Sequence, residues 1–173
     1  MQLETKHFGT ITIEEEKILT FPDGIPGFEE NNRYVFLQNP EEGIPFHWLQ
    51  SVDDAELTFV VANPFLIRVD YDFELPDHVV TKLDIQDREE VQIFCIVRIP
   101  EKVDDMTINL TAPLILNTRT GQGKQVVLED DRYHPRHFVS EELAESKQIL
   151  DAANEAVAQA GEPAPNTPAE GGK

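Results

Sequence analysis

The stretch FLIRVDYDFEL, residues 65–75, alternates apolar side chains with charged ones in steps of two. The stretch VQIFCIVRIP, residues 91–100, repeats this alternation, and its additional apolar residues Phe94 and Ile96 indicate that both faces are partly covered. Successive side chains of a β-strand point to opposite faces, so alternation over this length is typical of half-buried strands. We therefore predict one strand or two successive strands over residues 65–75, and a further strand over residues 91–100.

Short apolar runs of the same kind occur along most of the chain, and turn residues separate them. The turns DGIPG, NPEEGIP, NPF and TRTGQGK are rich in Pro, Gly and Asn. Many short strands between such turns are typical of an antiparallel sandwich or barrel. The further predicted strands are GTITI (9–13), ILTF (18–21), YVFLQ (34–38), LTFVVA (57–62), TINLTAPLILN (107–117) and KQVVLED (124–130).

Two segments have the spacing of helices. In PDHVVTKLDI, residues 76–85, we expect Asp77 to be the N-cap and Val80 and Leu83 to share one face. A second helix is expected over residues 140–161, with acidic residues in its first turn, where they complement the helix dipole.

In the second helix we expect Ser140 to be the N-cap. Its apolar positions fall a heptad apart, but Ala, Ser and Lys flank them, so we expect a marginal helix that frays. These positions are Leu143, Leu150 and Val157. From Gly161 onward the composition is Pro, Gly, Ala and Glu, which predicts a disordered tail.

Charge is the strongest feature of the composition. Lys and Arg number 14 and Asp and Glu number 33, for a formal net charge of -19 over 173 residues. Nucleic-acid affinity comes mostly from cations that replace counterions, so we expect no direct binding to nucleic acid. The charge serves solubility alone or faces a basic partner, and composition does not separate these two interpretations.

Other bulk features favour a soluble protein of the cytoplasm. The start of the chain lacks a basic segment followed by an apolar run, and no run has the roughly 18 apolar residues of a membrane helix. Cys95, the one cysteine of the chain, lies in an apolar run, which is typical of a small buried side chain. We expect one domain with a tail, and no membrane association.

TFPDGIPGF, residues 20–28, joins two predicted strands through two prolines and two glycines. A phosphate-binding loop would need Lys and Ser or Thr after the glycines, and these are absent here. Pro22 with Gly24, and then Pro26 with Gly27, instead predict two consecutive tight turns. The apolar side chains of this loop either dock inward or form preorganised contacts for a partner.

The stretch YHPRH, residues 133–137, is the most enzyme-like part of the chain. His134 and His137 have a spacing seen in paired metal ligands, but a zinc site needs a third ligand. The alternative is a basic and aromatic turn that packs on the domain. The three serines lie outside a Gly-x-Ser-x-Gly motif, and we expect no catalytic site, no metal and no cofactor.

Several motifs, taken together and in order, resemble the FliW family of flagellar assembly factors. The motifs are FPDGIPGF, LQS, NPF, NLTAPLILN and GKQV, and the similarity runs from about Phe8 to about Phe138. The resemblance implies a mainly β protein, a small antiparallel β-barrel-like domain with one or two short helices and a disordered C-terminal tail. We place this domain at residues 1–143 and the marginal helix and tail at residues 144–173.

The resemblance also implies a function and two partners. FliW-like proteins bind flagellin in the bacterial cytoplasm before its export. They also bind the carbon storage regulator CsrA, an RNA-binding repressor of flagellin translation, and hold it off the flagellin message when flagellin has been exported. The implied role is a binding switch without catalysis. We expect the protein to be a monomer when free. A general acidic chaperone, without a regulatory partner, is the alternative.

Two segments are the candidate contact surfaces for these partners. The first is the double turn, with Asp23, Ile25 and Phe28. The second is the strand-like run from residue 109 to residue 114, where a proline implies a strand edge or a bulge that could pair with another chain. Its candidate residues are Asn109, Leu110 and Pro113.

Overall fold

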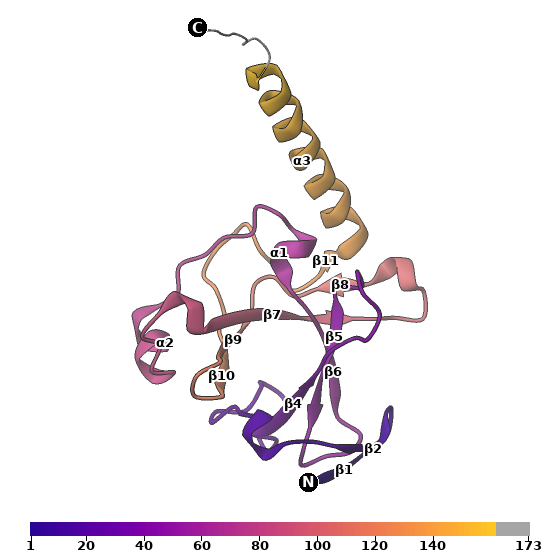
Figure 1. Ribbon diagram of the computed structural model, residues 1–173, viewed down its shortest axis with the longest axis vertical. Helices are drawn as coiled ribbons and strands as arrows, with labels where there is room; N and C mark the ends of the chain where they lie inside the picture. The colour runs from indigo at the N-terminus through magenta and orange to yellow at the C-terminus, as the bar shows by residue number, and fades with distance from the viewer. Residues whose placement is uncertain (162–173) are drawn as a thin grey trace, which may run out of the picture.

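The computed structural model describes residues 1–161, and its main body is a closed β-barrel (Figure 1). Around the ring the strands follow the order β7, β6, β5, β4, β3, β10 and β9, and β7 pairs with β9 to close it. Neighbouring strands are antiparallel, except for one parallel contact between β10 and β3. The predicted fold class, a small and mainly antiparallel barrel with few helices, is confirmed.

The ring is built from short strands. Their bounds are β3 Ile18–Thr20, β4 Arg33–Leu37, β5 Phe46–Ser51, β6 Thr58–Ala62, β7 Val91–Arg98, β9 Leu114–Asn117 and β10 Gln122–Gln125. Two more strands, β8 Thr107–Ile108 and β11 His137–Phe138, extend the sheet beyond β7. A separate hairpin is formed by β1 Gln2–Thr5 and β2 Gly9–Thr12. Sequence alternation did not single out β1, β5 or β11.

Alternation along β7 assigns its side chains to two different cores. Phe94 and Ile96 pack with the interior cluster of the barrel. Cys95 and Val97 belong to a second cluster on the outer face, beneath α1 and the start of the C-terminal helix. Both faces of β7 are therefore covered, as its sequence indicated. The buried residues of the interior cluster are Phe21, Ile25, Tyr34, Leu49, Val61, Leu114 and Leu116.

Helices and the hairpin cover the outer face of the barrel. The short helix α2, Asp77–Lys82, packs through Val79 and Leu83 against Ile115 of β9. The β1–β2 hairpin packs on Val35 of β4. Single turns of 3-10 helix occur at η1 Glu15–Lys17, η2 Arg88–Glu90 and η3 Val103–Asp105.

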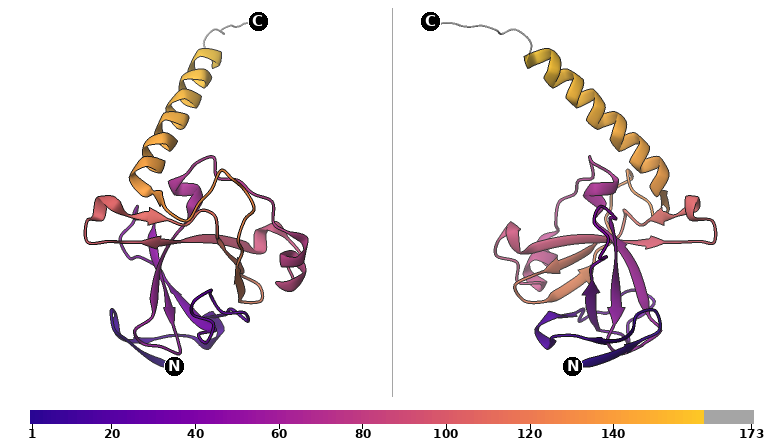
Figure 2. Two further views of the ribbon diagram at one scale, coloured as in Figure 1. Left: turned by 180° about the vertical axis from the view of Figure 1, so that it is seen from behind. Right: turned by 45° about the vertical axis from the view of Figure 1, so that its right-hand side comes forward.

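The C-terminal helix α3, Val139–Gly161, begins on the barrel and then projects away from it (Figure 2). Val139, Glu142 and Ser146 are buried against the body, whereas Leu150 and Val157 are 48% and 70% exposed. The helix spans 23 residues, and its bounds nearly coincide with the helix predicted over residues 140–161. It also runs across the domain boundary predicted at residue 143, which stays a prediction. The tail predicted after Gly161 lies outside the described residues.

The strand prediction over residues 65–75 is wrong. The segment opens with the short helix α1, Pro64–Ile67, in which the Asn63 side chain accepts a hydrogen bond from the Phe65 backbone N–H. An Asn cap followed by Pro in the first turn favours a helix start, and this local signal outweighs the alternation. Residues 71–75 retain alternating burial but pair with no strand among the described residues.

Two predicted helix caps are also wrong. Asp77 is the first residue of α2, and Pro76 stands at the cap without a side-chain hydrogen bond. The buried face of α2 holds Val79 with Leu83, whereas Val80 is half-buried. Ser140 lies inside α3, which begins at Val139 directly after β11.

The single strand predicted over residues 107–117 is divided in two. Asn109 Oδ1 accepts a hydrogen bond from the Ala112 backbone N–H at 3.2 Å, which closes a turn between β8 and β9. Pro113 follows this turn and lacks the N–H that a continuous ladder would need. The position of Pro113 predicted a strand edge or a bulge, and the structure instead places it after a turn, directly before β9.

Candidate partner-binding surfaces

The loop TFPDGIPGF forms the double turn that its prolines and glycines predicted. The Gly24 N–H donates to the Phe21 carbonyl at 2.8 Å, and the Phe28 N–H donates to the Ile25 carbonyl at 2.7 Å. Gly24 and Gly27 both have positive φ, at 68° and 91°. A Cβ on Gly24 would lie 2.6 Å from the Glu29 Cα, so only glycine fits that position.

The double turn presents its two apolar side chains differently. Ile25 is 1% exposed and belongs to the interior cluster of the barrel, so its role is structural. Phe28 is 41% exposed and packs edge-on against Phe59 of β6, with ring centroids 5.1 Å apart. Of these two candidates, Phe28 is the one that offers surface to a partner.

Asp23 lies at the tip of the first turn, between two lysines. Its carboxylate oxygen Oδ2 is 2.6 Å from Lys82 Nζ of α2 and 2.9 Å from Lys124 Nζ of β10. The hydrogen bond from Lys82, and then that from Lys124, hold the pKa of Asp23 below its ordinary value. Asp23 therefore links the double turn to α2 and β10, and the two lysines compensate its negative charge.

The second candidate segment is mostly buried. Leu110 is fully buried in the outer cluster, and its carbonyl accepts a hydrogen bond from the Tyr71 hydroxyl at 2.7 Å. Pro113 is buried, and its carbonyl accepts from the Val126 backbone N–H. Asn109 is half-buried, and its side chain accepts the hydrogen bond that closes the turn between β8 and β9. The two candidate segments belong to different hydrophobic clusters, and their role as contact surfaces stays a prediction.

A groove that the sequence did not reveal lies between the 72–75 segment, α2 and β7. It has a volume of about 730 Å³ and a floor of half-buried apolar side chains. The acids Asp72, Glu74 and Asp87 lie along its lining with one cation, Arg88. The six apolar residues of its floor are Phe73, Leu75, Val80, Ile85, Val91 and Ile93. Individually these residues resemble core positions, so only the fold brings them to one open surface.

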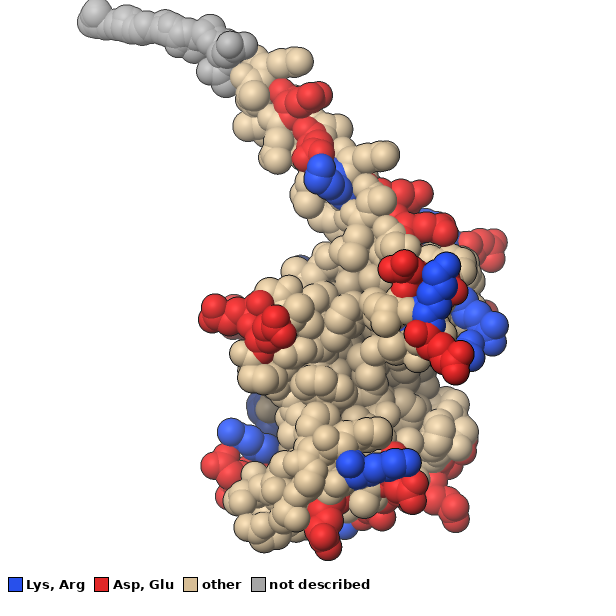
Figure 3. All heavy atoms as spheres, turned by 90° about the vertical axis from the view of Figure 1, so that its right-hand side faces the viewer, with Lys and Arg blue, Asp and Glu red and all other residues tan. Residues whose placement is uncertain are grey.

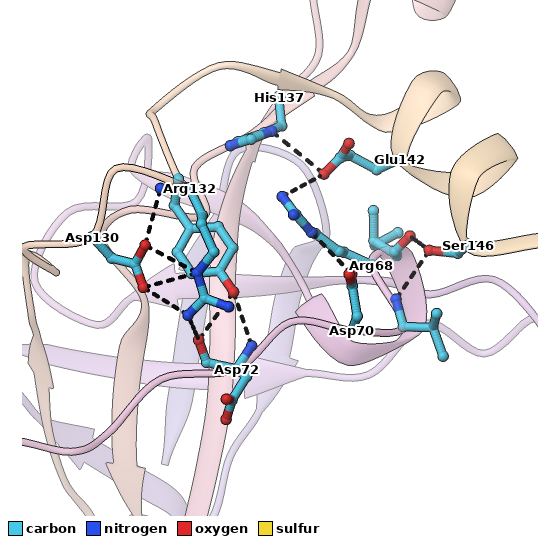
Figure 4. A network of polar contacts seen from close by, with 11 residues as sticks. Arg68, Asp70, Asp72, Asp130, Arg132, His137, Glu142 and Ser146 are labelled. Carbon is cyan, nitrogen blue, oxygen red and sulfur yellow. Dashed lines mark hydrogen bonds and ion pairs between the residues drawn. The ribbon is translucent and has the colours of Figure 1, made fainter. Parts of the chain in front are cut away.

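A polar network attaches α3 to the barrel (Figure 4). Arg68 Nη1 lies 3.2 Å from Glu142 Oε1, and Arg68 Nε lies 3.1 Å from Asp70 Oδ1. The Ser146 hydroxyl donates to the Ile67 carbonyl at 2.9 Å and accepts from the Val69 N–H. Burial raises the pKa of Glu142, while the charge of Arg68 lowers it. The network thus fixes the first two turns of α3 to α1.

His134 and His137 lie at the edge of this network and stack with ring centroids 3.7 Å apart. The His134 backbone N–H donates to His137 Nε2 at 3.0 Å, so the ring proton of neutral His137 is on Nδ1, facing Glu142 Oε1 at 3.4 Å. Burial, then His134 and Arg68, lower the pKa of His137 to about 4. Both ring nitrogens of His137 therefore face protein groups, in the way expected of the packed turn.

Acidic side chains dominate one face of the molecule (Figure 3). They gather at both ends of the barrel and along α3, and a belt without charge crosses the barrel between them. In residues 1–161, no three His, Cys, Asp or Glu side chains are placed to hold a metal ion. Among the described helices, none has the length and apolar character needed to cross a bilayer.

Comparison with known proteins identifies the family. A sequence model of the FliW family, described as FliW protein, matches residues 2–139. The chain is 49% identical over 148 residues to the flagellar assembly factor FliW of Alkaliphilus metalliredigens, covering 86% of this chain and 91% of that protein. The FliW protein of Caldicellulosiruptor saccharolyticus is 43% identical over 146 residues, covering 84% and 95%.

A solved structure agrees with these sequence matches. The crystal structure of a flagellar assembly factor FliW superimposes with a TM-score of 0.74 at 36% identity, covering 80% of this chain and 96% of that one. The match to the family model ends at Val139, where α3 begins, so most of α3 lies outside it. The chain belongs to the FliW family of flagellar assembly factors.

Proposed function

We propose that this protein is a two-partner binding switch of the bacterial cytoplasm, without catalytic activity. In this role it binds flagellin before export, and when free of flagellin it binds CsrA and relieves repression of flagellin translation. The observation that carries the proposal is membership in the FliW family over almost the whole barrel. The acidic surface, with its net charge of -19, supports it because a repressor that binds RNA presents cations.

Electrostatics alone would weaken RNA binding to a repressor held beside this surface. Two unit charges 4 Å apart interact by about 1 kcal/mol in water and by about 4 kcal/mol at an effective dielectric constant of 20. Several acidic side chains near the RNA site would therefore repel phosphates without occupying that site. Salt would reduce this effect, because exposed charges are screened beyond about 10 Å at 0.1 M ionic strength.

The test is a competition experiment with purified flagellin and CsrA. We expect a separate complex with each partner, and we expect flagellin to displace CsrA, since overlapping or mutually incompatible surfaces couple the two binding events. Size-exclusion chromatography with light scattering would resolve the species. A stable complex of all three proteins would contradict the switch.

Salt dependence separates the switch from the alternative, a general acidic chaperone. An acidic chaperone would bind weakly, lose its clients at moderate salt, and depend little on any one side chain. The switch predicts that Phe28→Ala weakens binding of one partner at a temperature where the variant is still folded, although loss of the contact with Phe59 lowers its melting temperature. Gln38→Ala, away from the double turn, is the control for the effect of substitution itself.

A further inference from the structure

The 72–75 segment lies outside every strand and has no partner strand among the described residues. Phe73 and Leu75 are half-buried on the groove floor, while Asp72 and Glu74, which alternate with them, are exposed. This period of two is that of an extended chain. Within residues 1–161, no backbone N–H or C=O from Phe73 to Leu75 has a hydrogen-bond partner. The segment is therefore an open edge of the kind to which another strand adds.

The groove beside this edge has an apolar floor that is not fully covered. Val80 and Ile85 come from the α2 region, and Val91 and Ile93 come from β7. All four are half-buried, and Ile85, Val91 and Ile93 pack on the buried cluster that contains Val79 and Leu83. A strand that pairs with the open edge would direct alternate side chains onto this floor. Apolar residues at every second position fit it.

The charge of the groove indicates what stands between those apolar residues. Asp72, Glu74 and Asp87 lie along the lining, and none of the three forms an ion pair among the described residues. Arg88 is the single cation of the lining. Elsewhere on the surface, acids such as Asp23 are compensated by lysines. The lining therefore favours a ligand that carries Lys or Arg.

We propose that this groove is a docking site for an extended segment of another protein, in which apolar residues alternate with Lys or Arg. The segment adds as a strand to the edge at Phe73–Leu75, its apolar side chains cover the floor, and its cations meet Asp72 and Glu74. The proposal rests on the proposed function only for the identity of the natural partner. It names a surface, and a synthetic ligand tests that surface directly.

The probe is a short peptide of alternating valine and lysine, titrated into the isotope-labelled full chain and followed by NMR. We expect the amide signals of Phe73, Glu74 and Leu75 to shift with the methyl signals of Ile85 and Ile93. A peptide with glutamate in place of lysine is expected to bind at least about ten-fold more weakly, a difference of about 1.4 kcal/mol. Shifts spread evenly over the acidic surface, or none at the groove, would overturn the proposal.

Strand addition is tested by N-methylation of the peptide. One version carries methyl groups on the backbone nitrogens of the valines, and the other carries them on the backbone nitrogens of the lysines. A strand presents alternate backbone N–H groups to its two edges, so the two versions block different edges. We expect one version to lose binding and the other to retain it. Equal binding of both versions would show that the segment does not add as a strand.

Charge recognition is tested with matched variants of the protein. The double variant Asp72→Lys with Glu74→Lys is expected to bind the valine–lysine peptide at least about ten-fold more weakly than the wild type does. Glu101→Lys with Asp104→Lys makes the same change in net charge at exposed acids outside the groove, and is expected to bind as the wild type does. Equal losses in both variants would reduce the effect to overall charge and contradict the proposal.

The same variants separate this inference from the proposed function. If the wild type binds the peptide in the groove but binds neither flagellin nor CsrA, the proposed function fails and the groove remains a peptide site. If it binds those proteins while the peptide leaves the groove unperturbed, the groove inference fails. Groove shifts that appear on concentrating the protein alone would identify a second copy as the occupant, and the proposal would be wrong.

Discussion

Residues 65–75 and β7 share an alternating pattern but have opposite fates in the fold. Every part of β7 has a neighbour, because β9 and β8 pair along it and β6 pairs with its second half. Residues 65–75 begin as a helical turn and then cross the outer face of the barrel, where no strand of residues 1–161 pairs with them. Alternation thus indicates which side chains face a core, but it does not indicate whether the backbone is paired.

The difference assigns separate roles to the two segments. Pairing and burial on both faces make β7 a central part of barrel stability. The unpaired segment instead attaches other parts of the molecule, since Arg68 holds α3 and Tyr71 reaches the Leu110 carbonyl. The backbone of its far end, at Phe73–Leu75, has no hydrogen-bond partner among the described residues. Substitutions in the two segments should therefore have very different consequences.

The largest effect is expected from Ile96→Pro in β7. Ile96 pairs with Val61 of β6, and its carbonyl accepts the Asn109 backbone N–H at 3.0 Å. Proline there removes a donor from a central strand and an apolar side chain from the barrel interior, so we expect a loss of about 3 kcal/mol or more. Urea unfolding measures it, and a stable variant would show that β7 is not central.

A smaller effect is expected from Arg68→Ala, at the start of the unpaired segment. The Glu142 side chain is 9% exposed, and without Arg68 it would lose its cationic partner while the charges of Glu145 and Asp70 still act on it. We expect a loss of about 1–3 kcal/mol, concentrated in the docking of α3. Circular dichroism and urea unfolding measure it. Lys147→Ala, which removes an exposed pair with Asp151, should change stability by less than about 0.5 kcal/mol.

The same junction should give the protein a pH dependence. Folded His137 has a pKa of about 4, below the ordinary value of 6.5, so the unfolded chain binds more protons between these values. The stability that His137 contributes is present above pH 6.5 and is lost as the pH falls toward 4. The raised pKa of Glu142 acts in the opposite direction, because its stabilising contribution is lost as the pH rises above 4.5.

Comparison of the wild type with His137→Gln isolates the histidine. We expect the melting temperature of the wild type to fall more steeply between pH 6.5 and 4 than that of the variant, since glutamine does not titrate and Glu142 is present in both. Parallel pH profiles would show that His137 is not held neutral in the folded state.

The smallest effect on stability is expected from Glu74→Pro, in the open part of the segment. The Glu74 side chain is exposed and its backbone N–H has no partner among the described residues. Proline should therefore change the free energy of unfolding by no more than about 0.5 kcal/mol. Together with Ile96→Pro, this variant compares proline in two segments whose sequences alternate in the same way. A large loss at Glu74 would mean that its backbone is paired.

Sequence predicted the parts of the molecule that depend on local chemistry. The double turn followed from Pro22, Gly24, Pro26 and Gly27, whose backbone preferences decide it. The barrel strands with clear alternation were found, and the motifs shared with the FliW family indicated closure into a barrel. The cap at Asn63 before Pro64 was a signal within the sequence that could have corrected the strand predicted there.

The candidate surfaces were much less accessible from sequence. Ile25 and Leu110 have the same apolar character as Phe28, and only the fold shows that the first two are buried and the third is exposed. The groove joins side chains from residues 65 to 93, and the apolar ones among them have individual patterns like those of core residues. Long-range placement of this kind depends on packing, which no local pattern encodes.

Amide hydrogen exchange tests the central claim most directly, namely that the Phe73–Leu75 edge is open in the free protein and paired when a partner binds. In the free protein we expect these amides to exchange rapidly while those of Cys95 and Val97 in β7 are protected. In the complex with CsrA or flagellin, exchange should slow markedly at those amides of Phe73–Leu75 that face the added strand. Protection of this edge in the free protein, or unchanged rapid exchange in both stable complexes, would contradict the account.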